Sequence, residues 1–155
     1  MSKGYQFDPP AIIHPAIMIG AGMMLTPSFI QKYKITHVIN CAYPEDCPVW
    51  VSSEFRNNYE CLMANDGLDV DILDWYPLFR KTLSSFLRDP SRERVFVHCQ
   101  CGINRSMFLT TAFVCEVFGY PYEETIRSLK QQRPCALKNY EFARQVKLFV
   151  SKKKA

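Results

Sequence analysis

Residues 94–106 read RVFVHCQCGINRS, and this stretch decides the fold. It begins with a short apolar run over residues 95–97, which predicts a buried strand. A nucleophilic residue type, Cys99, follows, and a loop with a single glycine, Gly102, leads to an Arg-Ser pair. Residues 107–118 are then apolar nearly all round, which is typical of a helix buried in the middle of a domain. The predicted order of strand, tight loop and buried helix organises the rest of the chain.

A loop of this kind favours the binding of an anion. It aims several backbone N–H groups and the positive end of the helix dipole at one point. Five residues between Cys99 and Arg105 suffice to wrap the three oxygens of a phosphoryl group, while the guanidinium closes the ring with a two-pronged contact. Gly102 lets the backbone turn inward, either by a positive φ or by close approach to a neighbour. The residues predicted to bind phosphate are Gln100, Cys101, Gly102, Ile103, Asn104 and Arg105.

The order His-Cys, five residues, Arg-Ser resembles the signature of the cysteine-dependent protein tyrosine phosphatases. The size of the chain and the flanks of the loop are most similar to the dual-specificity branch. The resemblance implies that Cys99 attacks phosphorus as a thiolate and forms a cysteinyl-phosphate. Ser106 is then expected to donate a hydrogen bond to the sulfur, and His98 to fix the loop by hydrogen bonding or only to pack at the strand end. No metal and no cofactor are expected.

A leaving alkoxide or phenoxide needs a proton, which a carboxylic acid can supply. The candidates are Asp66, Asp69, Asp71 and Asp74. Family resemblance places the acid at Asp66, just after a predicted strand, with Asp71 as the second choice. Asn139 fits a late asparagine of the family that braces the loop, and it is otherwise the N-cap of the last helix.

Two loop positions depart from the commonest family pattern. Cys101 stands where alanine is usual, and Asn104 where serine is usual. Asn-Arg before a hydroxyl residue also resembles the related RNA 5′-phosphatases, whereas the neutral Gln100 and Ile103 argue against a polyanionic lipid. The leading hypothesis is a metal-independent phosphatase acting on phosphotyrosine and phosphoserine or phosphothreonine in proteins. The alternatives are an RNA 5′-phosphatase and a non-catalytic phospho-binding module.

The composition favours one intracellular globular domain. The chain has 155 residues, a net charge of +4 and seven cysteines. No apolar run reaches the ~18 residues of a membrane span, and the first residues hold no apolar signal-peptide core. The cysteines are therefore expected to be free thiols in a reducing compartment, the cytoplasm or the nucleus. A single domain over residues 1–155 is predicted, with a loose arm at 1–10 and a solvated basic tail at 151–155.

The remaining pattern alternates strands with helices and then becomes helical. Strands are expected at 12–13, 17–19, 35–39 and 60–64, in addition to 95–97. Thr26 is the expected N-cap of a helix that runs to about residue 33, and Asp74 that of a helix from about residue 75. Gly119 and Pro121 separate the buried helix from the next one. This order predicts an α/β fold whose central, mostly parallel sheet carries helices on both faces.

Cys41 is a candidate redox partner of Cys99. It follows the predicted strand at 35–39, and if that strand lies parallel beside 95–97, both sulfurs emerge at the same sheet edge. A disulfide needs Cα atoms within ~7 Å, which neighbouring strands satisfy. We therefore predict that Cys41 resolves an oxidised Cys99; the alternative is a buried residue at a strand end.

Overall fold

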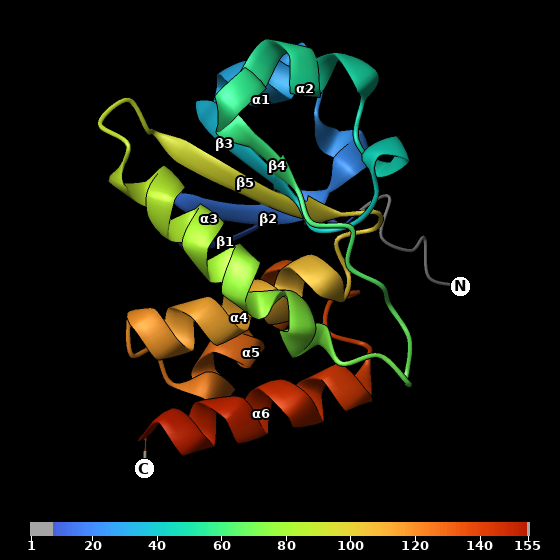
Figure 1. The fold of residues 1–155 in the computed structure, drawn as a ribbon, viewed down its shortest axis with the longest axis vertical. Helices are drawn as coiled ribbons and strands as arrows, with labels where there is room; N and C mark the ends of the chain where they lie inside the picture. Colours follow the sequence, from blue (N-terminus) through green and yellow to red (C-terminus); the bar gives the residue numbers. More distant parts are fainter. Residues whose placement is uncertain (1–7, 155) are drawn as a thin grey trace.

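The computed structural model describes residues 8–154 and is built around one five-stranded sheet (Figure 1). The strands lie in the order β1-β2-β5-β3-β4. Their bounds are Ala11–His14 for β1, Ile17–Ala21 for β2, Ile35–Asn40 for β3, Tyr59–Cys61 for β4 and Arg94–Cys99 for β5. Strands β2, β5, β3 and β4 run parallel, and only the edge strand β1 is antiparallel to its neighbour. The mostly parallel sheet is confirmed.

Within residues 8–154, six α-helices flank the sheet, and they lie on both of its faces as predicted. Helices α1 (Pro27–Tyr33) and α2 (Val49–Phe55) lie on one face, at the top of Figure 1. The other face carries α3 (Tyr76–Arg88), α4 (Arg105–Val117), α5 (Tyr122–Gln132) and α6 (Tyr140–Lys154). Helix α4 packs on β5 and β2 and is covered in turn by α6.

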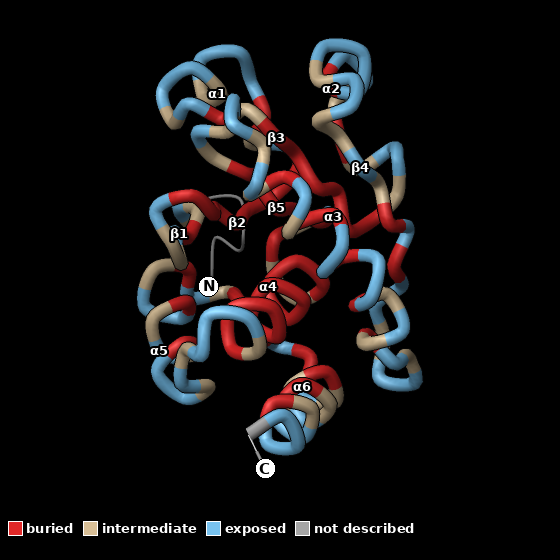
Figure 2. Tube along the Cα trace, turned by 60° about the vertical axis from the view of Figure 1, so that its left-hand side comes forward, coloured by how far each residue is buried: buried red, intermediate tan, exposed pale blue. Residues whose placement is uncertain are grey.

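The sheet separates two apolar cores because side chains alternate between its faces. In β5, Val95 and Val97 enter the larger core beneath α4, whereas Phe96 enters the smaller core beneath α1 and α2. Helix α4 is buried from Arg105 to Cys115, as the red tube at the centre of Figure 2 shows. This burial explains why the sequence of the helix is apolar nearly all round.

Local signals fix several helix ends. Thr26 accepts a hydrogen bond from the backbone N–H of Phe29 at 3.2 Å, so its predicted N-cap role is confirmed. Gly119, with φ of 74°, follows α4 in the left-handed conformation that terminates helices. The predicted Asp74 cap is wrong. Helix α3 starts at Tyr76, and Asp71 instead caps the preceding 3-10 helix by accepting from Leu73 N at 3.0 Å.

Three further expectations need correction. Helix α2 has no counterpart in the sequence prediction. Residues 151–154 are not a separate tail, because they continue α6, although residues 151–153 are exposed as expected. The arm is not loose at Asp8 and Pro9, whose carbonyls accept from Arg133 at 2.7 and 3.2 Å; residues 1–7 and 155 lie outside the described part of the chain. None of the helices within residues 8–154 has the length and apolar content to cross a membrane.

Candidate active site

The loop predicted to bind phosphate joins the end of β5 to the start of α4, at the edge of the sheet where the parallel strands end. Gly102 adopts φ of +68°, and a Cβ on it would lie 2.5 Å from the carbonyl carbon of Gly20 in the neighbouring strand β2. Both reasons given for a glycine here therefore hold. The loop can press against β2 only because this residue lacks a side chain.

Cys99 and Ser106 meet across this loop. The Sγ of Cys99 and the Oγ of Ser106 form a hydrogen bond at 3.2 Å, and both residues are buried. The Ser106 hydroxyl thus lies where the sequence analysis expects it, within reach of the sulfur. It can donate to a sulfur that carries negative charge.

Arg105 is buried at the start of α4 with part of its guanidinium unused. One terminal nitrogen donates to the carbonyl of Ala64 at 3.0 Å, which ties α4 to the segment after β4. Its Nε is buried and has no hydrogen-bond acceptor within residues 8–154. A buried donor without an acceptor is unfavourable by about 1–3 kcal/mol. An oxyanion bound in the loop would satisfy it.

Asp66 is the acidic candidate that the fold brings to the loop. One carboxylate oxygen accepts from the side-chain amide of Asn139 at 2.9 Å, and the other from that of Asn104 at 3.0 Å. Asp71, the second choice, is engaged in capping the 3-10 helix before α3. Asn139 makes contacts of both expected kinds: its Oδ1 caps α6 by accepting from Phe142 N at 3.0 Å, and its backbone N–H donates to Asn104 Oδ1 at 2.8 Å.

His98 is completely buried beneath the loop. Its Nδ1 donates to the carbonyl of Cys99 at 3.0 Å, so its predicted hydrogen bond to the loop is present. Burial lowers the pKa of His98 to about 4, against the opposing effects of that hydrogen bond and of the Asp46 carboxylate. The imidazole is therefore neutral at physiological pH.

Arg133 braces the loop from outside and is a residue that sequence reasoning missed. Its side chain is fully buried, and it donates to the carbonyls of Gly102 at 2.9 Å and Cys101 at 2.5 Å. The sequence marks this arginine only as the end of α5 before a proline. By donating to two loop carbonyls, Arg133 fixes the orientation of these two peptide groups.

Cys41 lies at the same sheet edge as Cys99. Strand β3 runs parallel beside β5 with Asn40 opposite His98, and the N–H of Cys41 donates to the His98 carbonyl at 2.7 Å. Burial raises the pKa of the Cys41 thiol well above its ordinary value, and the neighbouring Cys99 raises it further. The predicted juxtaposition of the two cysteines is thus present in the backbone pairing.

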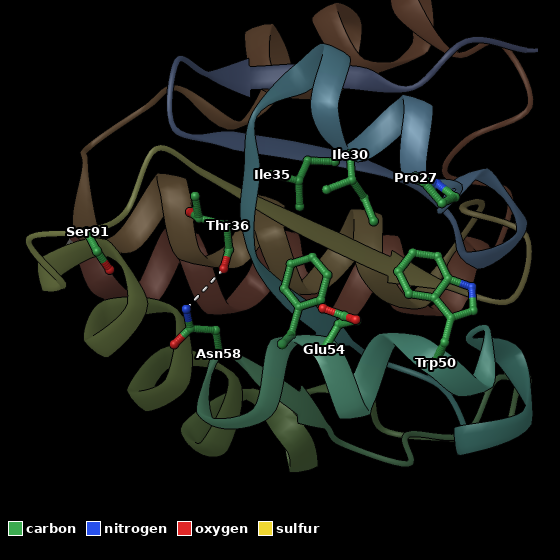
Figure 3. A pocket seen from close by; sticks show the side chains of 9 residues that line it. Pro27, Ile30, Ile35, Thr36, Trp50, Glu54, Asn58 and Ser91 are labelled. Atoms are coloured by element: carbon green, nitrogen blue, oxygen red, sulfur yellow. Dashed lines mark hydrogen bonds between the residues drawn. The ribbon is translucent and has the colours of Figure 1, made fainter.

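A large hollow of the described residues lies away from the phosphate loop. A pocket of about 640 Å³ lies between α1 and α2 (Figure 3). It is lined by Pro27, Ile30, Ile35, Thr36, Trp50, Glu54, Phe55, Asn58 and Ser91. None of these residues belongs to the loop. A pocket of about 480 Å³ reaches the loop at Gln100, on the side of the 3-10 helix Pro44–Asp46. No cluster of histidine, cysteine and carboxylate side chains suited to a metal ion occurs in the described residues.

Comparison with known proteins agrees with this geometry. A family model described as "Dual specificity phosphatase, catalytic domain" matches residues 17–152. The chain belongs to this family. Dual specificity protein phosphatase 4 of Homo sapiens is 30% identical over 143 residues, which are 92% of this chain. Those residues are 35% of the human protein, so this dual-specificity phosphatase domain spans about a third of that relative.

Two further comparisons give a second relative and a structural neighbour of the dual-specificity phosphatase domain. Serine/threonine/tyrosine-interacting protein A of Xenopus laevis is 27% identical over 139 residues, covering 86% of this chain and 61% of that protein. Human DUSP28 matches in structure with a TM-score of 0.78 at 17% sequence identity, covering 95% of this chain and 96% of that one. At that identity the structural match shows the fold alone.

Proposed function

We propose that this domain is a metal-independent phosphatase that hydrolyses phosphotyrosine and phosphoserine or phosphothreonine in proteins. The observation that carries the proposal is the meeting of three groups at one sheet edge. They are the Cys99 sulfur beside the Ser106 hydroxyl, the buried Arg105 Nε without an acceptor, and the Asp66 carboxyl group. Membership of the dual-specificity family supports the same activity.

The proposed reaction has two steps. The Cys99 thiolate attacks phosphorus, the ester P–O bond breaks, and protonated Asp66 gives its proton to the leaving oxygen. Arg105 and the N–H groups of residues 100–104 hold the three equatorial oxygens throughout. Water then attacks the cysteinyl-phosphate, Asp66 takes up the proton of the water, and the P–S bond breaks. The Ser106 hydroxyl stabilises the departing thiolate, and inorganic phosphate leaves.

The test is a turnover panel with a matched trapping variant. Phosphotyrosine, phosphoserine and phosphothreonine peptides are compared with triphosphate-ended RNA and with inositol phospholipids. Cys99→Ser is expected to abolish turnover but to keep phosphopeptide binding, because the N–H cradle remains while the hydroxyl is a poor nucleophile. Arg105→Ala is expected to lose both. Turnover by Cys99→Ser close to that of the wild type would refute the covalent mechanism.

A non-catalytic phospho-binding module is the second candidate. The similarity to the Xenopus relative, whose printed name describes an interacting protein, favours it. Tight phosphopeptide binding by the wild type without any turnover would establish it. Preferential hydrolysis of the RNA end would instead support the RNA 5′-phosphatase suggested by Asn104 and Arg105.

The cysteines support a reducing compartment for this domain. None of the cysteines within residues 8–154 forms a disulfide, and Cys41 and Cys99 are buried at the end of the sheet. Action in the cytoplasm or the nucleus would keep the Cys99 thiol available for catalysis.

A further inference from the structure

Asn104 has a position in the loop that the phosphate-binding assignment does not explain. It lies one residue before Arg105, yet its side chain turns away from the anion site toward two other segments. Its Oδ1 accepts from the backbone N–H groups of Lys138 at 2.9 Å and Asn139 at 2.8 Å. Its Nδ2 donates to Asp66 at 3.0 Å.

These partners fix the orientation of the Asn104 amide. Only the carbonyl end of an amide can accept from two N–H groups, so the NH₂ end must face the Asp66 carboxylate. Flipping the amide would set N–H against N–H at residues 138 and 139 and oxygen against oxygen at Asp66. The side chain is therefore locked as a donor toward the candidate acid.

Asp66 is an exposed residue on a segment without regular secondary structure. Hydrogen bonds from two side-chain amides hold its carboxylate in place. Asn139 holds one oxygen at 2.9 Å and Asn104 the other at 3.0 Å. Each carboxyl oxygen has two lone-pair directions, so one amide N–H on each leaves a site for the proton that catalysis requires. The clamp is thus compatible with Asp66 acting as acid and as base.

We propose that Asn104 is a positioning residue that holds the Asp66 carboxyl group in register with the phosphate loop. The proposal rests on the proposed phosphatase function. Asn104 belongs to the loop that binds the phosphoryl group. Its hydrogen bond therefore fixes the position of the Asp66 carboxyl group relative to the leaving oxygen. A serine at this position, which is usual in the family, has too short a side chain to make both sets of contacts. The effect is greatest for the alkoxide of phosphoserine and phosphothreonine, which needs a proton more than a phenoxide does.

The test compares aryl phosphates that differ only in the leaving group. We would measure kcat/KM with p-nitrophenyl phosphate, a good leaving group, and phenyl phosphate, a poor one. The variants are Asn104→Ser and Asn104→Asp. The aspartate keeps acceptors for residues 138 and 139 but faces Asp66 with a like charge. Asn58→Ala is the matched control, because Asn58 makes one side-chain bond, to the Thr36 carbonyl at 3.1 Å, and lines the pocket between α1 and α2.

Both Asn104 variants should lose about tenfold or more with phenyl phosphate relative to their loss with p-nitrophenyl phosphate, since misplacing a catalytic group by about 1 Å is worth up to about a hundredfold. The ratio of the two substrates does not depend on how much of the preparation is folded. Asn58→Ala should leave that ratio unchanged. In an Asp66→Asn background, Asn104→Ser should not change the ratio further. An equal loss on both substrates, or independent losses in the double variant, would overturn the proposal.

A second measurement separates this proposal from the proposed function. If the wild type hydrolyses none of the substrates, the phosphatase assignment fails, and the clamp is tested by urea unfolding instead. The midpoint shift of an Asp66→Ala, Asn104→Ser double variant should then be smaller than the sum of the single shifts, because the two side chains share a contact. Additive shifts would show that Asn104 does not hold Asp66.

Discussion

The buried His98 should make the folded domain less stable in acid. The imidazole is 0% exposed, and burial lowers the pKa of His98 to about 4, whereas an unfolded histidine titrates near pH 6.5. As the pH falls below about 6.5, the unfolded chain takes up a proton that the folded chain cannot accept until about pH 4. This contribution to stability is therefore complete above pH 6.5 and is lost between pH 6.5 and about 4.

The magnitude follows from the gap between the two pKa values. At 1.36 kcal/mol per pH unit, complete titration removes about 3 kcal/mol of the free energy of unfolding. Integrating the same linkage from pH 7 to pH 5 gives a loss of about 2 kcal/mol. Such a loss is a large fraction of the roughly 5–15 kcal/mol that a domain has.

The comparison that isolates it is wild type against His98→Asn. The side-chain amide introduced by that substitution can donate to the Cys99 carbonyl, as Nδ1 of the histidine does, but it does not titrate. Urea unfolding at pH 7, 6 and 5 should show the wild type losing about 2 kcal/mol more than the variant over this range. His14, whose pKa is also lowered by burial and by Arg92, is present in both proteins and cancels. Parallel stability profiles would refute the reasoning.

Three further predictions concern the phosphate loop. After treatment with mild peroxide, peptide mass mapping should show a Cys99–Cys41 disulfide that dithiothreitol reverses, because a sulfenic acid at Cys99 condenses with a nearby thiol and releases water. A Cys99–Cys101 link, or sulfinic acid at Cys99 with an unmodified Cys41 thiol, would contradict this prediction. Gly102→Ala should lower kcat/KM at least tenfold and destabilise the fold by about 1–3 kcal/mol, since its Cβ would meet the backbone of Gly20; wild-type kinetics would show that the loop relaxes at no cost. Arg133→Lys should destabilise the domain by about 2–4 kcal/mol in urea unfolding, because a single ammonium cannot replace the forked contacts to the loop. An unchanged unfolding midpoint would show that these contacts do not stabilise the loop.

The phosphate loop was predictable because its pattern is local. Cys99, Gly102 and Arg105 lie within seven consecutive residues, so their spacing in the sequence indicates that their side chains surround one loop. The choice of Asp66 as the acid rests on its place just after a predicted strand and on the family resemblance, and it stays a prediction. The hydrogen bonds from Asn104 and Asn139 to Asp66 could not be predicted from a local pattern, because these residues lie 38 and 73 positions from Asp66 along the chain.

The missed elements also have physical explanations. Helix α2 has seven residues, too few for an apolar period to show, and its first residue, Val49, is 90% exposed. Asp74 was a reasonable cap by residue type, but a 3-10 helix precedes α3, and its cap falls three residues earlier, at Asp71. The part played by Arg133 depends on contacts 31 and 32 residues away, which no local pattern reports.

Arg133 also determines where this domain can be cut. The same guanidinium that holds the carbonyls of residues 101 and 102 reaches the carbonyls of Asp8 and Pro9, and the Asp8 carboxylate accepts from Cys135 N at 2.9 Å. A fragment that starts at residue 17, where the family match begins, would lack β1 and these acceptors, and the fully buried Arg133 would lose two of its partners. A fragment that keeps all of these printed acceptors of Arg133 therefore has to include Asp8, a residue that lies outside the matched region and far along the chain from Cys99.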